Sequence, residues 1–149
     1  MAGVVTTNVD NVAPPEVWAD LSNNQKTALV DVRTAQEWAG IGRPDMSGIG
    51  KDAVYVEWRS APDMRINPDF AAQLDQQLGG VYPDRLFFLC RSGARSLEAA
   101  TTIQEILSSK GIECTCVNVA EGFEGDPGPS GARGTVNGWQ YHQLPWQTG

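Results

Sequence analysis

The side chains best suited to chemistry gather in one short segment, which reads Cys90-Arg91-Ser92-Gly93-Ala94-Arg95-Ser96. A cysteine just ahead of a helix has its thiolate form favoured by the helix dipole and by free backbone N–H groups. Two nearby arginines, Arg91 and Arg95, add positive charge, which favours the thiolate further and attracts an anionic substrate. The small residues between them let the loop curl tightly, with its N–H groups pointing inward as an anion cradle. The segment therefore predicts a nucleophile, Cys90, at the base of an anion-binding loop.

The length of this loop separates two kinds of chemistry. Cysteine-dependent phosphatases place five residues between the cysteine and an arginine, so that the loop surrounds a phosphate. Here four residues separate Cys90 from Arg95, which predicts a smaller bowl, better suited to one sulfur atom than to a tetrahedral oxyanion. The alternative is an inert cysteine that ends a buried strand, as most free cysteines are. The two flanking arginines favour the reactive interpretation.

Strands and helices alternate around this loop. Apolar runs predict strands over residues 28–32, 53–58, 85–89 and 112–119. Helical spacing and end signals predict helices over residues 14–21, 33–39, 67–78 and 93–110. This alternation predicts an α/β fold, a parallel sheet with helices on both faces. Ligands of such sheets bind beyond the carboxyl ends of the strands, and the strand over 85–89 ends directly at Cys90.

The 149 residues suit a single domain, which we expect to span residues 1–149. We expect about the first 12 residues to be flexible. The Gly/Pro-rich stretch 125–138 is interpreted as an inserted loop.

Charge and composition favour some partners and environments over others. A formal net charge of -7 repels phosphate backbones and anionic membranes, so we expect no nucleic-acid or membrane partner. The first 12 residues lack the basic start and apolar run of a signal peptide, and no segment approaches the ~20 apolar residues of a membrane span. Three cysteines, an odd number, do not suggest a secreted disulfide framework. We therefore expect a cytoplasmic protein.

Several segments, taken together, resemble the rhodanese-domain sulfurtransferases over most of the chain. Each short match is weak alone, but their order and spacing make a specific set. The first signature is similar to Leu29-Val30-Asp31-Val32-Arg33 followed by Glu37-Trp38. The active-site loop is similar to Phe88-Leu89-Cys90-Arg91-Ser92-Gly93-Ala94-Arg95-Ser96. The C-terminal signature is similar to Val117-Asn118-Val119, Glu121-Gly122-Phe123, Gly138-Trp139 and Leu144-Pro145-Trp146.

The resemblance implies a rhodanese-like fold and a double-displacement mechanism. The Cys90 thiolate would take a sulfur atom from a small anionic donor such as thiosulfate, forming a persulfide. A thiophilic acceptor (cyanide, a thiol or a protein thiol) would then remove it, which is covalent catalysis with ping-pong kinetics. The backbone N–H groups of Arg91, Ser92, Gly93, Ala94 and Arg95 would hold the persulfide, and the two arginine side chains would bind the donor. The resemblance implies no metal or organic cofactor.

The sequence departs from the family pattern in two places. The family often has a histidine in the segment that leads into the second strand, whereas this chain reads Ile41-Gly42-Arg43-Pro44-Asp45. That histidine is usually structural, so its loss leaves the chemistry intact. The stretch 125–138 splits the C-terminal signature, and if it rims the pocket it would alter the family's usual substrate preference.

Three further groups near the first two strands have structural and functional interpretations. Asp31 and Arg33 are expected to bridge the first strand to the surrounding loops rather than to act as acid and base, and Glu37 is expected to join that network. Trp58 and Arg59 follow the second strand at the same sheet edge as the loop. Arg59 would then add to the anion-binding rim and Trp58 would form an apolar wall; the alternative is a core tryptophan beside a solvated arginine.

The remaining cysteines and the sole histidine are expected to be structural. Cys114 and Cys116 stand two apart on a predicted strand, so both thiols face one side and are expected in the core rather than on a metal. Either could resolve the persulfide only if it reached the loop. His142 is expected at the surface rather than in a dyad with Cys90.

Two rival functions remain open at this point. One is an arsenate reductase or phosphatase on the same fold. The other is a rhodanese-type module that binds a partner protein without turnover, although such modules usually lack the cysteine that Cys90 supplies here. The sequence also leaves open the physiological donor and acceptor, the pathway and the oligomeric state.

Overall fold

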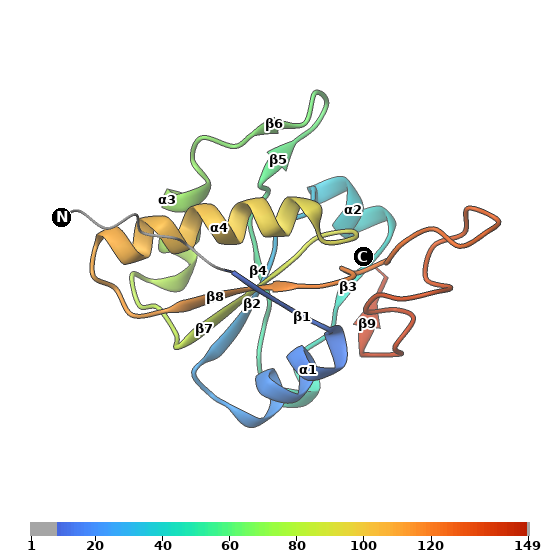
Figure 1. Cartoon of the computed structure of the whole chain (residues 1–149), viewed down its shortest axis with the longest axis horizontal. Helices are drawn as coiled ribbons and strands as arrows, with labels where there is room; N and C mark the ends of the chain where they lie inside the picture. Colours follow the sequence, from blue (N-terminus) through green and yellow to red (C-terminus); the bar gives the residue numbers. More distant parts are fainter. Residues whose placement is uncertain (1–8, 149) are drawn as a thin grey trace.

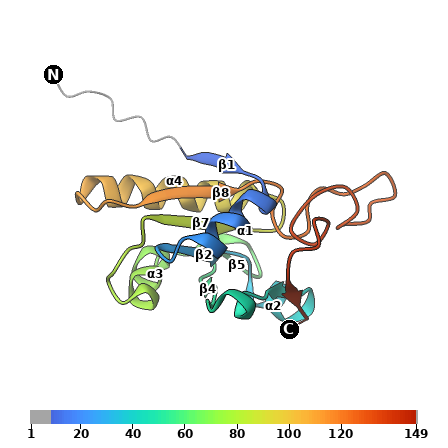
Figure 2. The same ribbon diagram turned by 90° about the horizontal axis from the view of Figure 1, so that it is seen from below.

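The computed structural model describes residues 9–148. Its centre is a five-stranded parallel sheet in the order β1-β8-β7-β2-β4. The strands are β1 (Asp10–Val12), β2 (Thr27–Asp31), β4 (Val54–Tyr55), β7 (Arg85–Leu89) and β8 (Thr115–Val119). The helices are α1 (Pro14–Asn23), α2 (Ala35–Gly40), α3 (Phe70–Leu78) and α4 (Ala94–Ser109). Figure 2 shows β1 and β4 at opposite edges, with β7 in the middle. The predicted α/β fold with a parallel sheet is confirmed.

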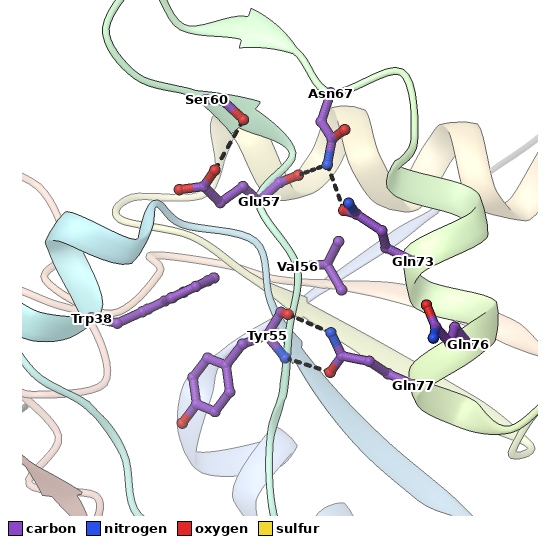
Figure 3. A pocket seen from close by; sticks show the side chains of 9 residues that line it. All are labelled: Trp38, Tyr55, Val56, Glu57, Ser60, Asn67, Gln73, Gln76 and Gln77. Atoms are coloured by element: carbon purple, nitrogen blue, oxygen red, sulfur yellow. Dashed lines mark hydrogen bonds between the residues drawn. The ribbon is translucent and has the colours of Figure 1, made fainter.

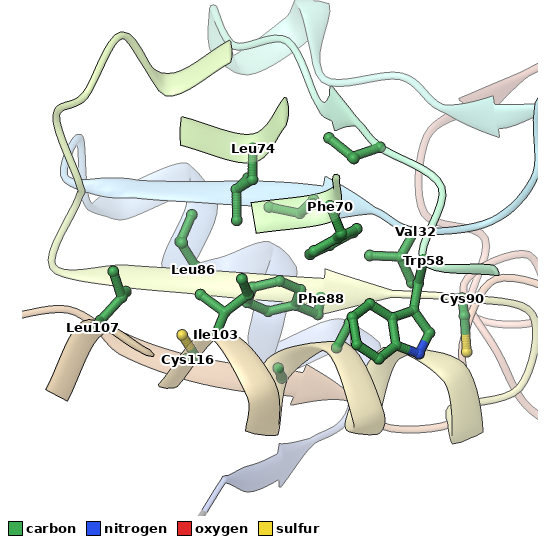
Figure 4. Packing of buried hydrophobic residues seen from close by; sticks show 14 of the residues in the cluster. Val32, Trp58, Phe70, Leu74, Leu86, Phe88, Cys90, Ile103, Leu107 and Cys116 are labelled. Atoms are coloured by element: carbon green, nitrogen blue, oxygen red, sulfur yellow. The ribbon is translucent and has the colours of Figure 1, made fainter. Parts of the chain in front are cut away.

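Helices cover both faces of the sheet, as expected. Helix α1 packs on one face, and α3 and α4 pack on the other (Figure 1). Successive residues of β7 supply the two cores alternately, because neighbouring side chains on a strand point to opposite faces. Leu86 and Phe88 face α3 and α4 (Figure 4), whereas Phe87 and Leu89 face α1. Strand β7 is thus buried on both sides, which fixes the position of Cys90 just beyond it.

The start of the chain differs in part from the expectation. Asp10–Val12, part of the segment expected to be flexible, pairs in parallel with β8 as the edge strand β1. No strand signal marks this segment in the sequence, because it is only three residues long and two of them are exposed polar side chains. The rest of the predicted flexible segment, residues 1–8, lies outside the described residues.

The second predicted strand and the segment before it also differ in detail from the expectation. Residues 53–58 contain only the two-residue strand β4, while the loop over 40–50 contains β3 (Arg43–Pro44) and the short 3-10 helix η1 (Ser47–Ile49). Two small antiparallel ribbons complete the fold: β3 with β9 (Trp146–Gln147), and β5 (Arg59–Ser60) with β6 (Arg65–Ile66). The first ribbon ties the C-terminal end of the chain to the segment that follows α2.

Helix α4 turns a slightly different face to the core than its spacing predicts. The apolar spacing of Leu97, Ala100, Ile103 and Leu107 predicts a core-facing stripe that begins at Leu97, but Leu97 is 38% exposed. The buried stripe instead begins at Ser96 and continues through Ala99, Ala100 and Ile103. The hydroxyl of Ser96 is thereby turned into the interior, toward the end of β7.

Candidate functional site

Cys90 lies where β7 ends and the turn into α4 begins (Figure 4). The residue is only 1% exposed and forms part of the core between the sheet and α4. Its sulfur nevertheless has polar neighbours: the backbone N–H of Gly93 donates to Sγ at 3.1 Å, and the Ser96 hydroxyl oxygen lies 3.1 Å from Sγ. The sulfur is therefore placed among hydrogen-bond donors at the carboxyl edge of the sheet, as the sequence predicted.

The backbone carbonyl groups at the start of the loop are hydrogen-bonded, whereas most of its N–H groups are not. The carbonyl of Cys90 accepts from the N–H of Phe123 at 2.8 Å, and that of Arg91 accepts from Glu124 and Gly125 at 3.0 and 3.1 Å. Within residues 9–148, the N–H groups of the loop residues other than Gly93 make no hydrogen bond; these residues are Arg91, Ser92, Ala94 and Arg95. The loop thus combines anchored carbonyls with free donors, the arrangement of an anion cradle.

Two glycines permit this arrangement. Gly93 has φ 114°, a left-handed value that side-chain-bearing residues rarely adopt. Gly122 lies against the outer side of the loop, where a Cβ would come within 2.5 Å of the backbone of Arg91 and Ser92. The segment 122–125 can approach closely enough to hold the loop carbonyls only because residue 122 has no side chain.

Arg91 and Arg95, the predicted donor-binding side chains, each pair with a carboxylate. Arg91 lies 3.2 Å from Glu124, whose side chain is only 8% exposed. Arg95 binds Glu37 with two hydrogen bonds, at 2.7 and 2.9 Å. Burial raises the pKa of Glu37, but the hydrogen bonds and charge of Arg95 outweigh this effect and lower it overall. Both pairs are long-range in sequence, and the sequence analysis did not identify Arg95 as the partner of Glu37.

Arg59, the third predicted donor-binding residue, is also paired. Its guanidinium donates to Glu98 at 3.1 Å and to the carbonyl of Met64 at 3.0 Å. Glu98 also accepts from the indole N–H of Trp58 at 2.9 Å. Trp58 is 5% exposed and packs edge-on against Phe70, so it is a core residue rather than an open apolar wall. No hydrogen bond or ion pair within residues 9–148 joins Arg59 to the Cys90 loop.

The Asp31–Arg33 pair confirms the structural interpretation. Both side chains are fully buried and bonded at 2.8 Å, and Arg33 also donates to the carbonyl of Gly42 at 2.8 Å. The guanidinium lies over the ring of Phe123 at 4.3 Å from its centroid. The pair thus joins the end of β2 to the loop after α2 and to the segment that holds the Cys90 loop. Glu37 does not join it by a direct bond, because its carboxylate is used by Arg95 and by the capping box of α2.

A chain of polar side chains that the sequence analysis did not identify reaches Cys90 from the other side. Ser96 Oγ lies 2.5 Å from Asn118 Oδ1, and the amide of Asn118 donates to Asn11 Oδ1 at 2.8 Å. The available signal for Ser96 was its helical spacing to Ala99, Ala100 and Ile103, which places it on the buried face of α4. Asn118 stands in the Val117-Asn118-Val119 segment of the family signature, but its contacts with Ser96 and Asn11 arise only from the tertiary fold.

Cys114 and Cys116 lie at the opposite end of the sheet. Cys116 is in register with Leu86 at the start of β7, four residues before Cys90, or about 13 Å along the strand. Both thiols are buried, as expected. The hydrogen bond with Cys114, together with burial, raises the pKa of Cys116. Neither thiol reaches the loop, so the structure excludes a resolving role within one molecule.

His142 pairs with Glu121 rather than with Cys90. Its Nε2 lies 2.8 Å from Glu121 Oε1, which also accepts from the N–H of Gly138 at 2.9 Å. The histidine side chain is 28% exposed. These bonds fasten the C-terminal segment to the residues just ahead of Gly122, so His142 has a structural place near the site.

The stretch 125–138 forms a closed loop at the end of the molecule where α4 begins (Figure 1). Its two ends meet, since a Cβ on Gly138 would lie 2.6 Å from the backbone nitrogen of Gly125. Arg133 donates to the carbonyl of Gly125 at 2.6 Å, and the N–H of Gly134 donates to Glu124 at 2.8 Å. The loop is therefore anchored to the same carboxyl-bearing residue that pairs with Arg91.

A cleft that lies elsewhere contains no cysteine. It has a volume of about 490 Å³ and opens beside α2, α3 and the edge strand β4 (Figure 3). The amide of Gln77 bonds the N–H and carbonyl of Tyr55, and Asn67 donates to the carbonyl of Glu57. Its polar side chains thus cover the unpaired backbone of an edge strand, which protects such edges from unwanted pairing.

The described residues were compared with what a metal site and a membrane span require. Among residues 9–148, no group of three or more potential metal ligands converges on one point. No helix in the same range is long and apolar enough to cross a bilayer.

Comparisons with known proteins place this geometry among relatives. The sequence model described as "Rhodanese-like domain" matches residues 13–125. The uncharacterized protein RC0915 of Rickettsia conorii is 32% identical over 140 residues, covering 94% of this chain and 98% of that protein. The crystal structure of Rv0390 from M. tuberculosis is 39% identical with a TM-score of 0.79, covering 95% of this chain and 98% of that one. The polysulfide-sulfur transferase homodimer of Wolinella succinogenes shares the fold at a TM-score of 0.53 and 18% identity, over 95% of this chain and 80% of that one.

Proposed function

Because the chain belongs to the rhodanese-like domain family, we propose that it is a sulfurtransferase that carries sulfane sulfur on Cys90. One observation supports this most strongly: the Cys90 sulfur accepts the Gly93 N–H at the base of a loop whose other N–H groups are free. Such a loop stabilises negative charge both on the thiolate and on the outer sulfur of a persulfide. No side chain acting as a base is needed once the thiolate has formed.

The first half-reaction moves one neutral sulfur atom to the protein. The Cys90 thiolate attacks the outer sulfur of a donor such as thiosulfate, and a sulfur–sulfur bond forms as the donor's own sulfur–sulfur bond breaks. The electron pair of the broken bond leaves with sulfite. The products are a Cys90 persulfide anion and sulfite, so the total charge is unchanged. The loop N–H groups that make no hydrogen bond within residues 9–148 would receive the outer persulfide sulfur.

The second half-reaction returns the site to its starting state. A thiophilic acceptor such as cyanide, a small thiolate or a protein thiolate attacks the outer sulfur of the persulfide. The bond to Cys90 breaks, its electron pair returns to the cysteine sulfur, and thiocyanate or a new persulfide leaves. Because the two substrates never need to be bound together, ping-pong kinetics are expected.

Arg91, Arg95 and Arg59 are proposed to assist donor binding, although each of them is paired with a carboxylate. Arg91 is the best placed, because its side chain is 45% exposed and its ion pair is only partly shielded. Arg95 would orient the loop from its bond to Glu37, and Arg59 would contribute charge at longer range. Since three carboxylates offset these arginines, donors other than thiosulfate also belong in the substrate panel, polysulfide among them.

A donor and acceptor panel tests this function against its rivals. We expect thiocyanate to form from cyanide with thiosulfate or polysulfide, with parallel lines in double-reciprocal plots and no activity in Cys90→Ser. Phenyl phosphate and arsenate are expected to be inert, because only four residues separate Cys90 from Arg95. Turnover of phenyl phosphate or arsenate without thiocyanate formation would replace the proposal with the phosphatase or reductase alternative. No turnover of any donor would favour the partner-binding module.

A further inference from the structure

The hydroxyl of Ser96 has more acceptors around it than hydrogens to give. Its oxygen lies 2.5 Å from Asn118 Oδ1, 3.1 Å from Cys90 Sγ and 3.2 Å from the carbonyl of Gly93. Ser96 is fully buried and Asn118 is 3% exposed. A serine hydroxyl carries a single hydrogen, so it can satisfy only one of these acceptors at a time.

The orientation of the Asn118 amide is fixed by its other partners. Its nitrogen lies 2.8 Å from Asn11 Oδ1 and 3.2 Å from the carbonyl of Gly93, and both of these are acceptors. The amide nitrogen must therefore donate to them, which leaves the amide oxygen to face Ser96 as an acceptor. Strands β1 and β8 together thus hold an acceptor 2.5 Å from the Ser96 oxygen.

We propose that Ser96 is a catalytic residue that donates its hydrogen to the Cys90 sulfur when that sulfur is anionic, and that Asn118 positions Ser96 and receives the hydrogen at other times. This rests on the proposed function for its place in a reaction cycle. In that cycle the negative charge sits on Cys90 Sγ before sulfur is taken up, and on the outer sulfur afterwards. A hydrogen bond to charged sulfur is stronger than one to a neutral amide, so the Ser96 hydrogen turns to Sγ in the thiolate state. It turns back to Asn118 when Sγ becomes the neutral inner atom of the persulfide.

The test is the pH dependence of Cys90 alkylation by iodoacetamide, with the modified Cys90 peptide quantified by mass spectrometry. Losing a hydrogen bond to a charged sulfur is expected to move the pH of half-maximal rate upward by roughly one to two units in Ser96→Ala. At a pH below the midpoint of the wild-type profile, alkylation should fall about tenfold or more, in proportion to the thiolate fraction. Ser96→Thr, which keeps a hydroxyl, is expected to restore most of the rate.

Asn118→Asp provides a second variant of nearly equal volume. A carboxylate retains the Ser96 hydrogen more strongly and adds negative charge beside the loop, so the alkylation profile is expected to move upward here as well. Thr27→Val is the control: it removes a buried hydroxyl at the far end of β2, where Thr27 bonds Asn24 and Lys51. Thr27→Val should lower the free energy of unfolding, measured with urea, and leave the pH profile of alkylation unchanged.

The outcomes separate this proposal from the proposed function. Folded Ser96→Ala and Asn118→Asp proteins with the wild-type profile would overturn the role of Ser96, even if sulfur transfer were observed. An equal upward shift in Thr27→Val would also overturn it, because the shift would then follow general stability. Alkylation needs no sulfur donor, so a shift in both site variants would support Ser96 even in a chain that fails the donor panel.

Discussion

Glu37 binds Arg95 through both carboxylate oxygens, at 2.7 and 2.9 Å, and the same carboxylate closes the capping box at the start of α2. One side chain therefore joins the first turn of α2 to the first turn of α4, directly beside Cys90. Because its side chain is only 17% exposed and is bonded to Glu37, Arg95 stabilises the position of the loop as well as supplying positive charge.

Glu37→Gln is expected to lower the free energy of unfolding by about 1.5–3 kcal/mol at pH 7, because it weakens charged hydrogen bonds to a largely buried guanidinium. The folded state lowers the pKa of Glu37 below its ordinary 4.5, so its contribution is fully present above that pH. It is lost as the pH falls through the folded-state value. In urea unfolding, the wild-type and Glu37→Gln proteins should therefore differ in free energy of unfolding at pH 7, and this difference should narrow below about pH 4.5.

Glu105, which is exposed on α4, provides the control for that series. Glu105→Gln should track wild type at every pH. A gap for Glu37→Gln that stays constant down to pH 3 would contradict the assigned ion pair.

Asp31→Asn is expected to cost about 3–5 kcal/mol, because it leaves the fully buried Arg33 without its counter-charge. The double variant Asp31→Leu/Arg33→Met removes both charges and should lose less than the single variant. Urea unfolding of the three proteins checks this order. A loss below about 1 kcal/mol in Asp31→Asn would show that the buried pair is not needed to hold β2 to the loops around Gly42 and Phe123.

Gly122→Ala tests the close approach that anchors the loop. Gly111 provides a matched control, because both glycines have φ +70°, but a Cβ at 111 meets nothing within 4 Å. Both variants are expected to lose about 1–2 kcal/mol from left-handed strain. Only Gly122→Ala should also displace the backbone of Arg91, with a loss of about 10²-fold in thiocyanate formation. Equal activity in the two variants would contradict the anchoring role of segment 122–125.

Removal of the two remote cysteines is expected to leave sulfur transfer intact. The free thiol of Cys116 is hydrogen-bonded to Cys114, and Cys116 lies about 13 Å along β7 from Cys90. The double variant Cys114→Ser/Cys116→Ala should form thiocyanate at the wild-type rate, with a modest loss of stability from the altered core. A tenfold loss of kcat with an unchanged unfolding midpoint would show that these thiols take part in the transfer.

The place of Cys90 could be predicted from the sequence because it depends on local signals. An apolar run ending at Leu89 and a helix pattern beginning near Gly93 define a strand, a turn and a helix without reference to the rest of the chain. The alternation of such units then specifies a parallel sheet with its sites at the carboxyl edge.

The charge balance of the site could not be predicted in the same way. Glu124 and Glu98 offset Arg91 and Arg59, but these pairings depend on where separate elements meet in space. The same reason explains why the sequence does not mark Asn118, on β8, as a neighbour of Ser96. Strand β1 was missed because pairing with β8, rather than its own residues, makes it a strand.

Intact-mass spectrometry after brief treatment with a sulfane donor tests the central claim most directly. We expect the wild-type chain to gain about 32 Da, the mass of one sulfur atom, and to lose this mass when cyanide is added. The Cys90→Ala variant is expected to show no gain in mass. A wild-type mass that stays unchanged with thiosulfate and with polysulfide, or an equal gain in Cys90→Ala, would contradict sulfur transfer through this thiol.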